Sequence, residues 1–186
     1  MSKESVSRET ALARYDAEFD RWRSALDAVG MNRMDEPGVM GEWSARHLVA
    51  HLAGWQWKTL ASMRTALSGG EYPPTPWPAT FNDRDSWEED GDVESVNQWI
   101  HDQAEPAPAN EIVSRSLQQW RDIRDIISGL DEGRLNDPSL FPRLEGRSLG
   151  RVLADDVLSG HTREHLDDDL EPWLERNRRR SDGGKT

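Results

Sequence analysis

Four long segments of this chain repeat apolar residues every three or four positions, which is the spacing of an amphipathic helix. They cover residues 8–29, 44–68, about 110–130 and 149 to about 170. The apolar stripe of the first segment consists of Leu12, Tyr15, Phe19, Trp22, Leu26 and Val29. No segment shows the strict alternation of a β-strand. The pattern therefore predicts an all-α protein built as a four-helix bundle.

The connection between the second and third segments is long and rich in proline. It reads Tyr-Pro-Pro-Thr-Pro-Trp-Pro from Tyr72 onward and continues into the acidic run of residues 88–90. These prolines exclude a long helix, and a shorter helix is expected afterwards, over residues 93–103. A connection of this length can cross the whole bundle. We therefore predict an up-down-down-up order with an extra short helix in the crossover.

The length of 186 residues fits one domain, which we expect over residues 1–175. Pro172 is expected to end or kink the fourth helix, because proline lacks the N–H that a helix interior requires. Residues 176–186 include the run Arg-Asn-Arg-Arg-Arg and are expected to form a disordered tail.

The composition restricts the partners of the protein. The net charge is −12, and phosphate binding needs clustered Lys and Arg, so no nucleic-acid partner is expected. No apolar run approaches membrane length and no signal core is found, so we expect a cytoplasmic protein without a membrane partner. The chain has no cysteine. Thiol chemistry would therefore require a small-molecule thiol.

Histidines carry the strongest chemical signal. His161 and His165 are four residues apart, which places them on one face of a helix, where both imidazoles can reach one metal ion. His51 lies near the start of the second segment. It can meet the other two only if the second and fourth helices are antiparallel, as the crossover allows. The sequence thus predicts a three-histidine site, suited to zinc or nickel and also to iron or copper, with open positions for water or substrate.

Neighbouring residues complete this candidate site. Glu164, Asp168 and Asp169 are close enough in sequence to orient a ligand, and Glu164 or Asp168 could act as a catalytic base. The tryptophans expected to line a substrate pocket are Trp43, Trp55, Trp77 and Trp99. Core packing would explain tryptophans equally well.

Other interpretations of the histidines stay open. His161 to His165 also fits the H-x-x-E-H signature of inverzincin peptidases, which further requires a downstream glutamate in a large fold. Alternatively, both are surface histidines on an acidic helix. His47 is expected to be structural or exposed, and the role of His101 is undetermined.

Two motif blocks resemble a known family. Trp43-Ser-Ala-Arg-His-Leu-Val-Ala-His51-Leu-Ala-Gly-Trp55 resembles the W-S-x(6)-H-L-x-G-W stretch of the DinB-like superfamily. Gly160-His161-Thr-Arg-Glu-His165-Leu resembles the same superfamily, in which the last helix of the ClbS/DfsB-like branch has a similar H-x-x-E-H. The likeness covers most of residues 10–175 and is greatest to the ClbS/DfsB-like branch. It implies a four-helix bundle with the same crossover and a divalent metal bound at the positions of His51, His161 and His165.

The resemblance also suggests activities. The superfamily includes transferases and isomerases that use bacillithiol, mycothiol or glutathione, and the ClbS-like branch includes a self-resistance protein that opens an electrophilic cyclopropane. We therefore expect a detoxifying transferase, isomerase or hydrolase for a small electrophilic metabolite, with or without a low-molecular-weight thiol. The alternatives are a non-catalytic binding or self-resistance protein and a structural module with a vestigial site. Whether the protein is an enzyme is left open, and a homodimer is compatible with the sequence.

Overall fold

The computed structural model describes residues 5–81, 92–155 and 160–183, and in these residues every regular element is a helix, joined by turns and loops. The α-helices are α1 (Arg8–Val29), α2 (Ala45–Ser68), α3 (Val93–Ala104), α4 (Ala109–Gly129), α5 (Glu132–Leu135), α6 (Leu149–Ala154), α7 (Gly160–His165) and α8 (Glu171–Gly183). Two short 3-10 turns, η1 (Met31–Arg33) and η2 (Pro142–Leu144), and a π-helical stretch, η3 (Leu166–Leu170), complete the described elements. The all-α prediction is confirmed.

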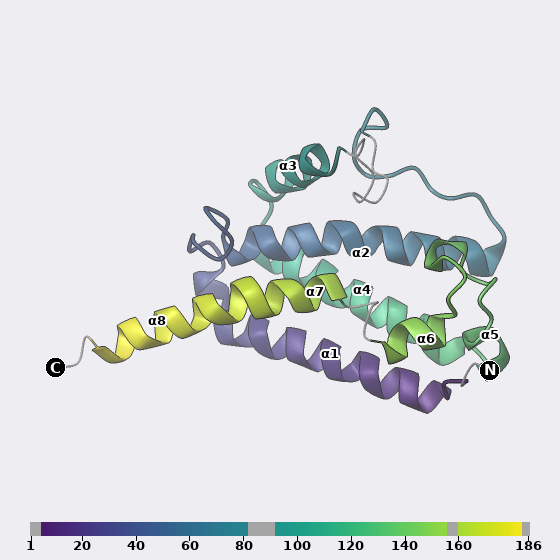
Figure 1. Ribbon diagram of the computed structural model, residues 1–186. Helices are drawn as coiled ribbons and strands as arrows, with labels where there is room; N and C mark the ends of the chain where they lie inside the picture. Colours follow the sequence, from purple (N-terminus) through teal and green to yellow (C-terminus); the bar gives the residue numbers. More distant parts are fainter. Residues whose placement is uncertain (1–4, 82–91, 156–159, 184–186) are drawn as a thin grey trace.

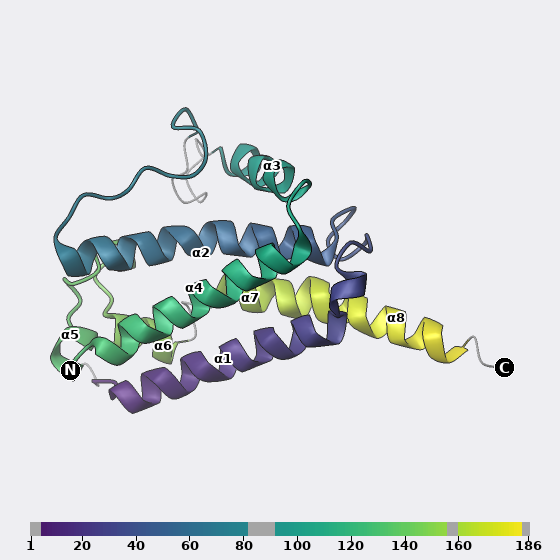
Figure 2. The same ribbon diagram turned by 180° about the vertical axis from the view of Figure 1, so that it is seen from behind.

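The long helices run in the predicted order (Figures 1 and 2). α1 and the continuous stretch α7–η3–α8 point in one direction, whereas α2 and α4 point in the other. The chain returns from the end of α2 to the start of α4 through the proline-rich connection and α3. α4 packs against both α1 and α2, and α3 packs against α2. The up-down-down-up order is therefore confirmed, and it makes α2 antiparallel to α7.

Aromatic side chains of α1 fasten that helix to α4. Phe19 stacks on Trp120 with a ring-centroid distance of 5.4 Å. The Tyr15 hydroxyl donates to the backbone carbonyl of Trp120 at 3.1 Å, and Trp22 Nε1 donates to Ser116 Oγ at 3.3 Å. Buried aromatic rings contribute large apolar areas, and these polar atoms have partners. The sequence stripe of α1 is thus the face that the bundle buries.

Serines that precede helices set where two of the elements begin. The Ser148 side chain accepts from Arg151 N at the start of α6. Ser44 precedes α2, and its backbone N–H donates to His47 Nδ1 at 3.2 Å. An imidazole therefore takes the place of the usual carboxylate of a capping box. None of the described helices is both long enough and apolar enough to cross a membrane.

The last helix continues through Pro172. Pro172 was expected to end or kink the helix, and it does not end it, because Pro172 is the second residue of α8, which continues to Gly183. Immediately before it, Glu171 N–H bonds to Leu166 O five residues back, so the turn there is π-helical. A proline ring clashes with the carbonyl four residues earlier in a regular α-helix, and one wider turn relieves that conflict. The helix changes register at Pro172 and does not stop.

Most of the C-terminal tail that was predicted to be disordered is helical, because α8 includes residues 176–183. Arg176 donates to the backbone carbonyl of Gly38 at 3.2 Å, and Trp173 Nε1 donates to that of Pro37 at 3.3 Å, so α8 is tied to the bundle. Of the helix expected from 149 to 170, residues 156–159 lie outside the described part of the chain, as does the acidic run at 88–90.

Candidate metal centre

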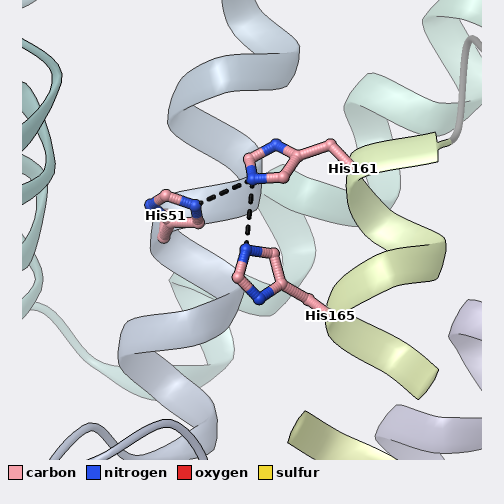
Figure 3. A group of neighbouring side chains, drawn as sticks. All are labelled: His51, His161 and His165. Atoms are coloured by element: carbon pink, nitrogen blue, oxygen red, sulfur yellow. Dashed lines mark hydrogen bonds between the residues drawn. The ribbon is translucent and has the colours of Figure 1, made fainter. Parts of the chain in front are cut away.

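Three imidazoles converge between α2 and α7 (Figure 3). His51 comes from the second turn of α2, and His161 and His165 come from consecutive turns of α7. Nε2 of His161 lies 3.1 Å from Nε2 of His51 and 3.1 Å from Nε2 of His165. A metal ion with bonds of about 2.0–2.1 Å holds neighbouring ligand atoms about 3.0–3.4 Å apart. The triad can therefore hold a metal ion, and the antiparallel pairing predicted from the crossover is what brings its members together.

A carboxylate orients one of these ligands. His165 Nδ1 lies 2.6 Å from Asp169 Oδ2, one turn further along the helix. An ionised carboxylate only accepts hydrogen bonds, so Nδ1 carries the proton and Nε2 presents its lone pair to the other two imidazoles. Carboxylate–histidine pairs of this kind accompany many metal-ligating histidines.

The protonation states of His51 and His161 also suit metal binding. Burial lowers the pKa of His51 to about 3, and the neighbouring His161 and His165 add to this effect. Loss of hydration lowers the pKa of His161 to about 4, with a further contribution from His165. Both rings are therefore neutral at pH 7, and the neutral imidazole is the form that binds a metal.

The triad lies on the wall of a cavity of about 770 Å³. α2, α3, α6, α7 and residues 141–147 enclose it. The apolar part of the wall includes Trp55, Met63, Phe141, Leu144, Leu149 and Val152. Polar residues on the wall include Lys58, Ser62, Asn97, Arg143, Arg147 and Glu164. Trp55 Nε1 donates to Asn97 Oδ1 at 2.9 Å, which links α2 to α3 at the cavity. A volume of this size admits a small organic molecule beside the three histidines.

Only some of the other predicted site residues line the triad cavity. Glu164 lines the cavity with the triad, whereas Asp168 is exposed and is not among the lining residues. Of the four tryptophans expected in a substrate pocket, Trp55 lines this cavity. Trp43 contacts the His51 ring edge-on at 5.7 Å without lining the cavity.

The remaining two tryptophans line a different, smaller cavity. Trp77 and Trp99 face a space of about 290 Å³ that α2 shares with α3 and α4. Trp77 is buried, and its ring lies 5.8 Å from that of Trp55. The sequence could not show which tryptophans line which cavity, because the connection that contains Trp77 has no helical periodicity.

A second polar cluster joins the start of α2 to the end of α3. His47, His101 and Glu105 lie close enough together to hold a metal ion. However, His47 Nδ1 accepts the backbone N–H of Ser44, so the proton of the neutral ring is on Nε2. That nitrogen lies 3.0 Å from Glu105 Oε1. Because a ligand nitrogen must be unprotonated, this cluster is better explained as a contact between helices, in agreement with the structural role expected for His47.

The cavity residues that were not predicted from the sequence include Lys58, Asn97, Arg143 and Arg147. Lys58 lies three residues after Trp55, on the same helical face, and this spacing could have indicated it. Asn97 falls on the polar side of the expected short helix. Arg143 and Arg147 lie on a segment without helical periodicity, so no sequence signal places them at the cavity.

The fold and the site together define a class: a helical bundle in which three histidines from two antiparallel helices form a candidate metal site beside a cavity. A comparison with protein families matches residues 14–167 to the DinB superfamily, and the chain belongs to that superfamily. The match does not resolve the branch, so closeness to the ClbS/DfsB-like branch stays a prediction. No curated protein and no solved structure matches the chain significantly.

Proposed function

We propose that this protein is an enzyme that uses a divalent metal, zinc or nickel, to act on a small electrophilic metabolite as a transferase, isomerase or hydrolase. The observation that carries the proposal is the convergence of three Nε2 atoms on the wall of a cavity, with those of His51 and His165 each 3.1 Å from that of His161. A bound divalent ion would supply Lewis acidity and lower the pKa of a water or thiol in the cavity.

The protein's own residues would divide the remaining work. Asp169 keeps His165 in the metal-binding tautomer. Glu164 would accept or deliver a proton within the cavity, since it lines the same wall as His161 and His165. Trp55 and Phe141 give the substrate an apolar wall that excludes water. A low-molecular-weight thiol is a suitable co-substrate because the chain has no cysteine.

The first test is the metal content of protein purified without an affinity tag. We expect about one divalent ion per chain in the wild type, and loss of the ion in His51→Ala and in His161→Ala. His101→Ala is the matched control, because it removes an imidazole from α3 outside the triad. A wild-type protein that takes up neither zinc nor nickel would refute the metal-dependent function.

The second test is turnover of an epoxide or a cyclopropane, with and without added thiol. Consumption only in the presence of thiol would identify a transferase, and consumption without it a hydrolase. Glu164→Gln should keep the metal and lower the rate by about 10²–10⁴-fold if Glu164 transfers a proton. An unchanged rate in this variant would remove Glu164 from the mechanism.

A non-catalytic binding function is the second candidate. It is favoured by the apolar share of the cavity wall, which would suit capture of an apolar toxin or metabolite. Trp55 on this wall provides the measurement. Fluorescence quenching by a ligand that is recovered unchanged, with no turnover in the presence of metal and thiol, would support binding over catalysis.

A further inference from the structure

We propose that the triad cavity selects a small molecule that carries an anionic group, a carboxylate or phosphate, and that Arg143 and Arg147 bind this group. The proposal rests on the proposed function, because it names a class of ligand for the same cavity. It follows from the charges on the wall, from the hydrogen-bonding state of the two arginines and from their position relative to the triad.

The charge of the wall is opposite to that of the chain. The protein has a net charge of −12, with 35 acidic and 23 basic side chains. Among the described residues with ionised side chains that line the cavity, Lys58, Arg143 and Arg147 are cationic and Glu164 is anionic. A low-dielectric cleft lined by one sign of charge attracts ligands of the opposite sign. An anionic ligand is therefore favoured in a cavity whose surroundings would otherwise repel it.

Two contacts hold Arg143 in place, and most of its N–H donors have no partner among the described residues. Its Nη1 donates to Ser62 Oγ at 3.2 Å, and its guanidinium lies 5.6 Å from the centre of the Tyr72 ring. A guanidinium has five N–H donors, and no carboxylate of the described residues forms an ion pair with this one. Contacts to a hydroxyl and a ring fix the direction of the side chain without neutralising its charge.

Arg147 is exposed, and within the described ranges its side chain forms neither an ion pair nor a hydrogen bond. Some of the other described arginines are paired with carboxylates, although others, such as Arg115 and Arg121, are not paired with any described carboxylate. Arg21, Arg124 and Arg151 each pair with a carboxylate at 3.0 Å or less. In a chain with an excess of carboxylates, two arginines without a carboxylate partner on one cavity wall are the donors that a ligand anion would use, because guanidinium binds carboxylate and phosphate through paired N–H groups.

The position of the arginines defines how the ligand lies. Arg143 and Arg147 belong to the 141–147 segment, whereas the triad belongs to α2 and α7, and all of them line one cavity. A ligand that reaches both therefore presents its anionic group to the 141–147 segment and its reacting group to the histidines. Lys58, buried and 5.2 Å from the centre of the Trp55 ring, lines the same cavity.

The test compares two thiols that differ in one charged group. 3-Mercaptopropionate carries a carboxylate, and 3-mercapto-1-propanol is its uncharged counterpart. Binding of each is measured by calorimetry with zinc-loaded and with metal-free protein. We expect 3-mercaptopropionate to bind about tenfold more tightly, and Arg143→Gln/Arg147→Gln to abolish this preference while 3-mercapto-1-propanol binds as before. Arg134→Gln/Arg151→Gln is the control, because it removes two exposed arginines that do not line the cavity.

The outcomes separate this inference from the proposed function. Equal binding of the two thiols, a preference that survives in Arg143→Gln/Arg147→Gln, or a preference lost equally in the control would each overturn the anion site. Failure of zinc to bind would count against the proposed function instead, and the metal-free measurement would still decide the anion site. Arg147→Gln alone covers the case in which the double variant fails to fold, because this side chain is exposed.

Discussion

Among single residues, Asp169 is the one whose substitution should most clearly weaken metal binding by the triad. Its carboxylate accepts from His165 Nδ1 at 2.6 Å and so keeps Nε2 free for a metal. We predict that Asp169→Asn lowers zinc affinity by about 10–100-fold, the usual effect of removing a partner that orients a ligand. Competition with a chromophoric chelator measures the affinity, and circular dichroism checks that the helix persists.

The adjacent residue provides the control for this prediction. Asp168→Asn removes the same charge one position away, from an exposed side chain that does not line the cavity. Zinc affinity should stay within about twofold of the wild type, since only a distant exposed charge is lost. Equal losses in the two variants would show that the acidity of the helix, and not the hydrogen bond to His165, supports metal binding.

Residue-scale prediction from the sequence succeeded where helical spacing applies. The four-residue spacing of His161 and His165 placed both on one face, and the structure confirms that they meet His51. Helical spacing did not show which of Asp168 and Asp169 contacts His165, because residues three and four positions apart can both be in contact along a helix. Arg143 and Arg147 were missed, because the position of a side chain on a loop depends on tertiary packing.

Among the helices, α3 is held against α2 by a close approach at Gly54. A methyl group at this position would lie 2.5 Å from Ile100 Cδ1 and 3.1 Å from Ile100 Cγ1. Gly54→Ala should therefore push α3 away from α2 and destabilise the protein by about 1–3 kcal/mol, the cost of overpacking a core. Chemical denaturation measures the change in the free energy of unfolding.

Two further variants test whether the contact between the added methyl group and Ile100 causes the loss of stability in Gly54→Ala. In Gly129→Ala, at the end of α4, no side chain lies within 4 Å of the added methyl group, so stability should stay the same or rise by about 0.5–1 kcal/mol. Ile100→Val removes Cδ1 and should recover part of the loss when combined with Gly54→Ala. A Gly54→Ala protein as stable as the wild type would show that the α2–α3 contact yields easily.

The elements were predicted to different degrees. α1, with the bounds Arg8–Val29, coincides with its apolar stripe, because a long amphipathic period leaves few alternatives. The π-helical turn at Leu166–Leu170 was not predicted, since a proline in a helical pattern can end the helix, kink it or shift its register. Which of these occurs depends on whether the residues beyond Pro172 find contacts, and α8 finds them with Gly38 and Pro37.

For the whole molecule, the crossover and the triad explain one another. A plain up-down-up-down bundle would make α2 parallel to the last helix, and a histidine early in one would lie far from a histidine late in the other. The long connection reverses this relation, and the 3.1 Å contact between His51 and His161 depends on it. Chain topology could be predicted here because a chemical constraint and a connection length pointed to the same order.

The stability of the metal-free protein should depend on pH through His51. His51 is buried, and its pKa of about 3 in the folded protein lies below the ordinary value of 6.5. Between these values the unfolded chain binds a proton that the folded chain does not, so stability is greatest above pH 6.5 and falls as the pH drops toward 3. The slope from this one residue is at most about 1.4 kcal/mol per pH unit.

Denaturation with a chelator present, at several pH values from 7 to 4.5, measures this slope. Other groups also titrate in this range, so the comparison is between variants. His51→Gln cannot take up the proton and should show a shallower slope than the wild type, whatever its stability at pH 7. If His51→Gln loses stability as steeply as the wild type, the acid sensitivity lies elsewhere in the bundle, and desolvation of His51 would not be what holds the triad neutral.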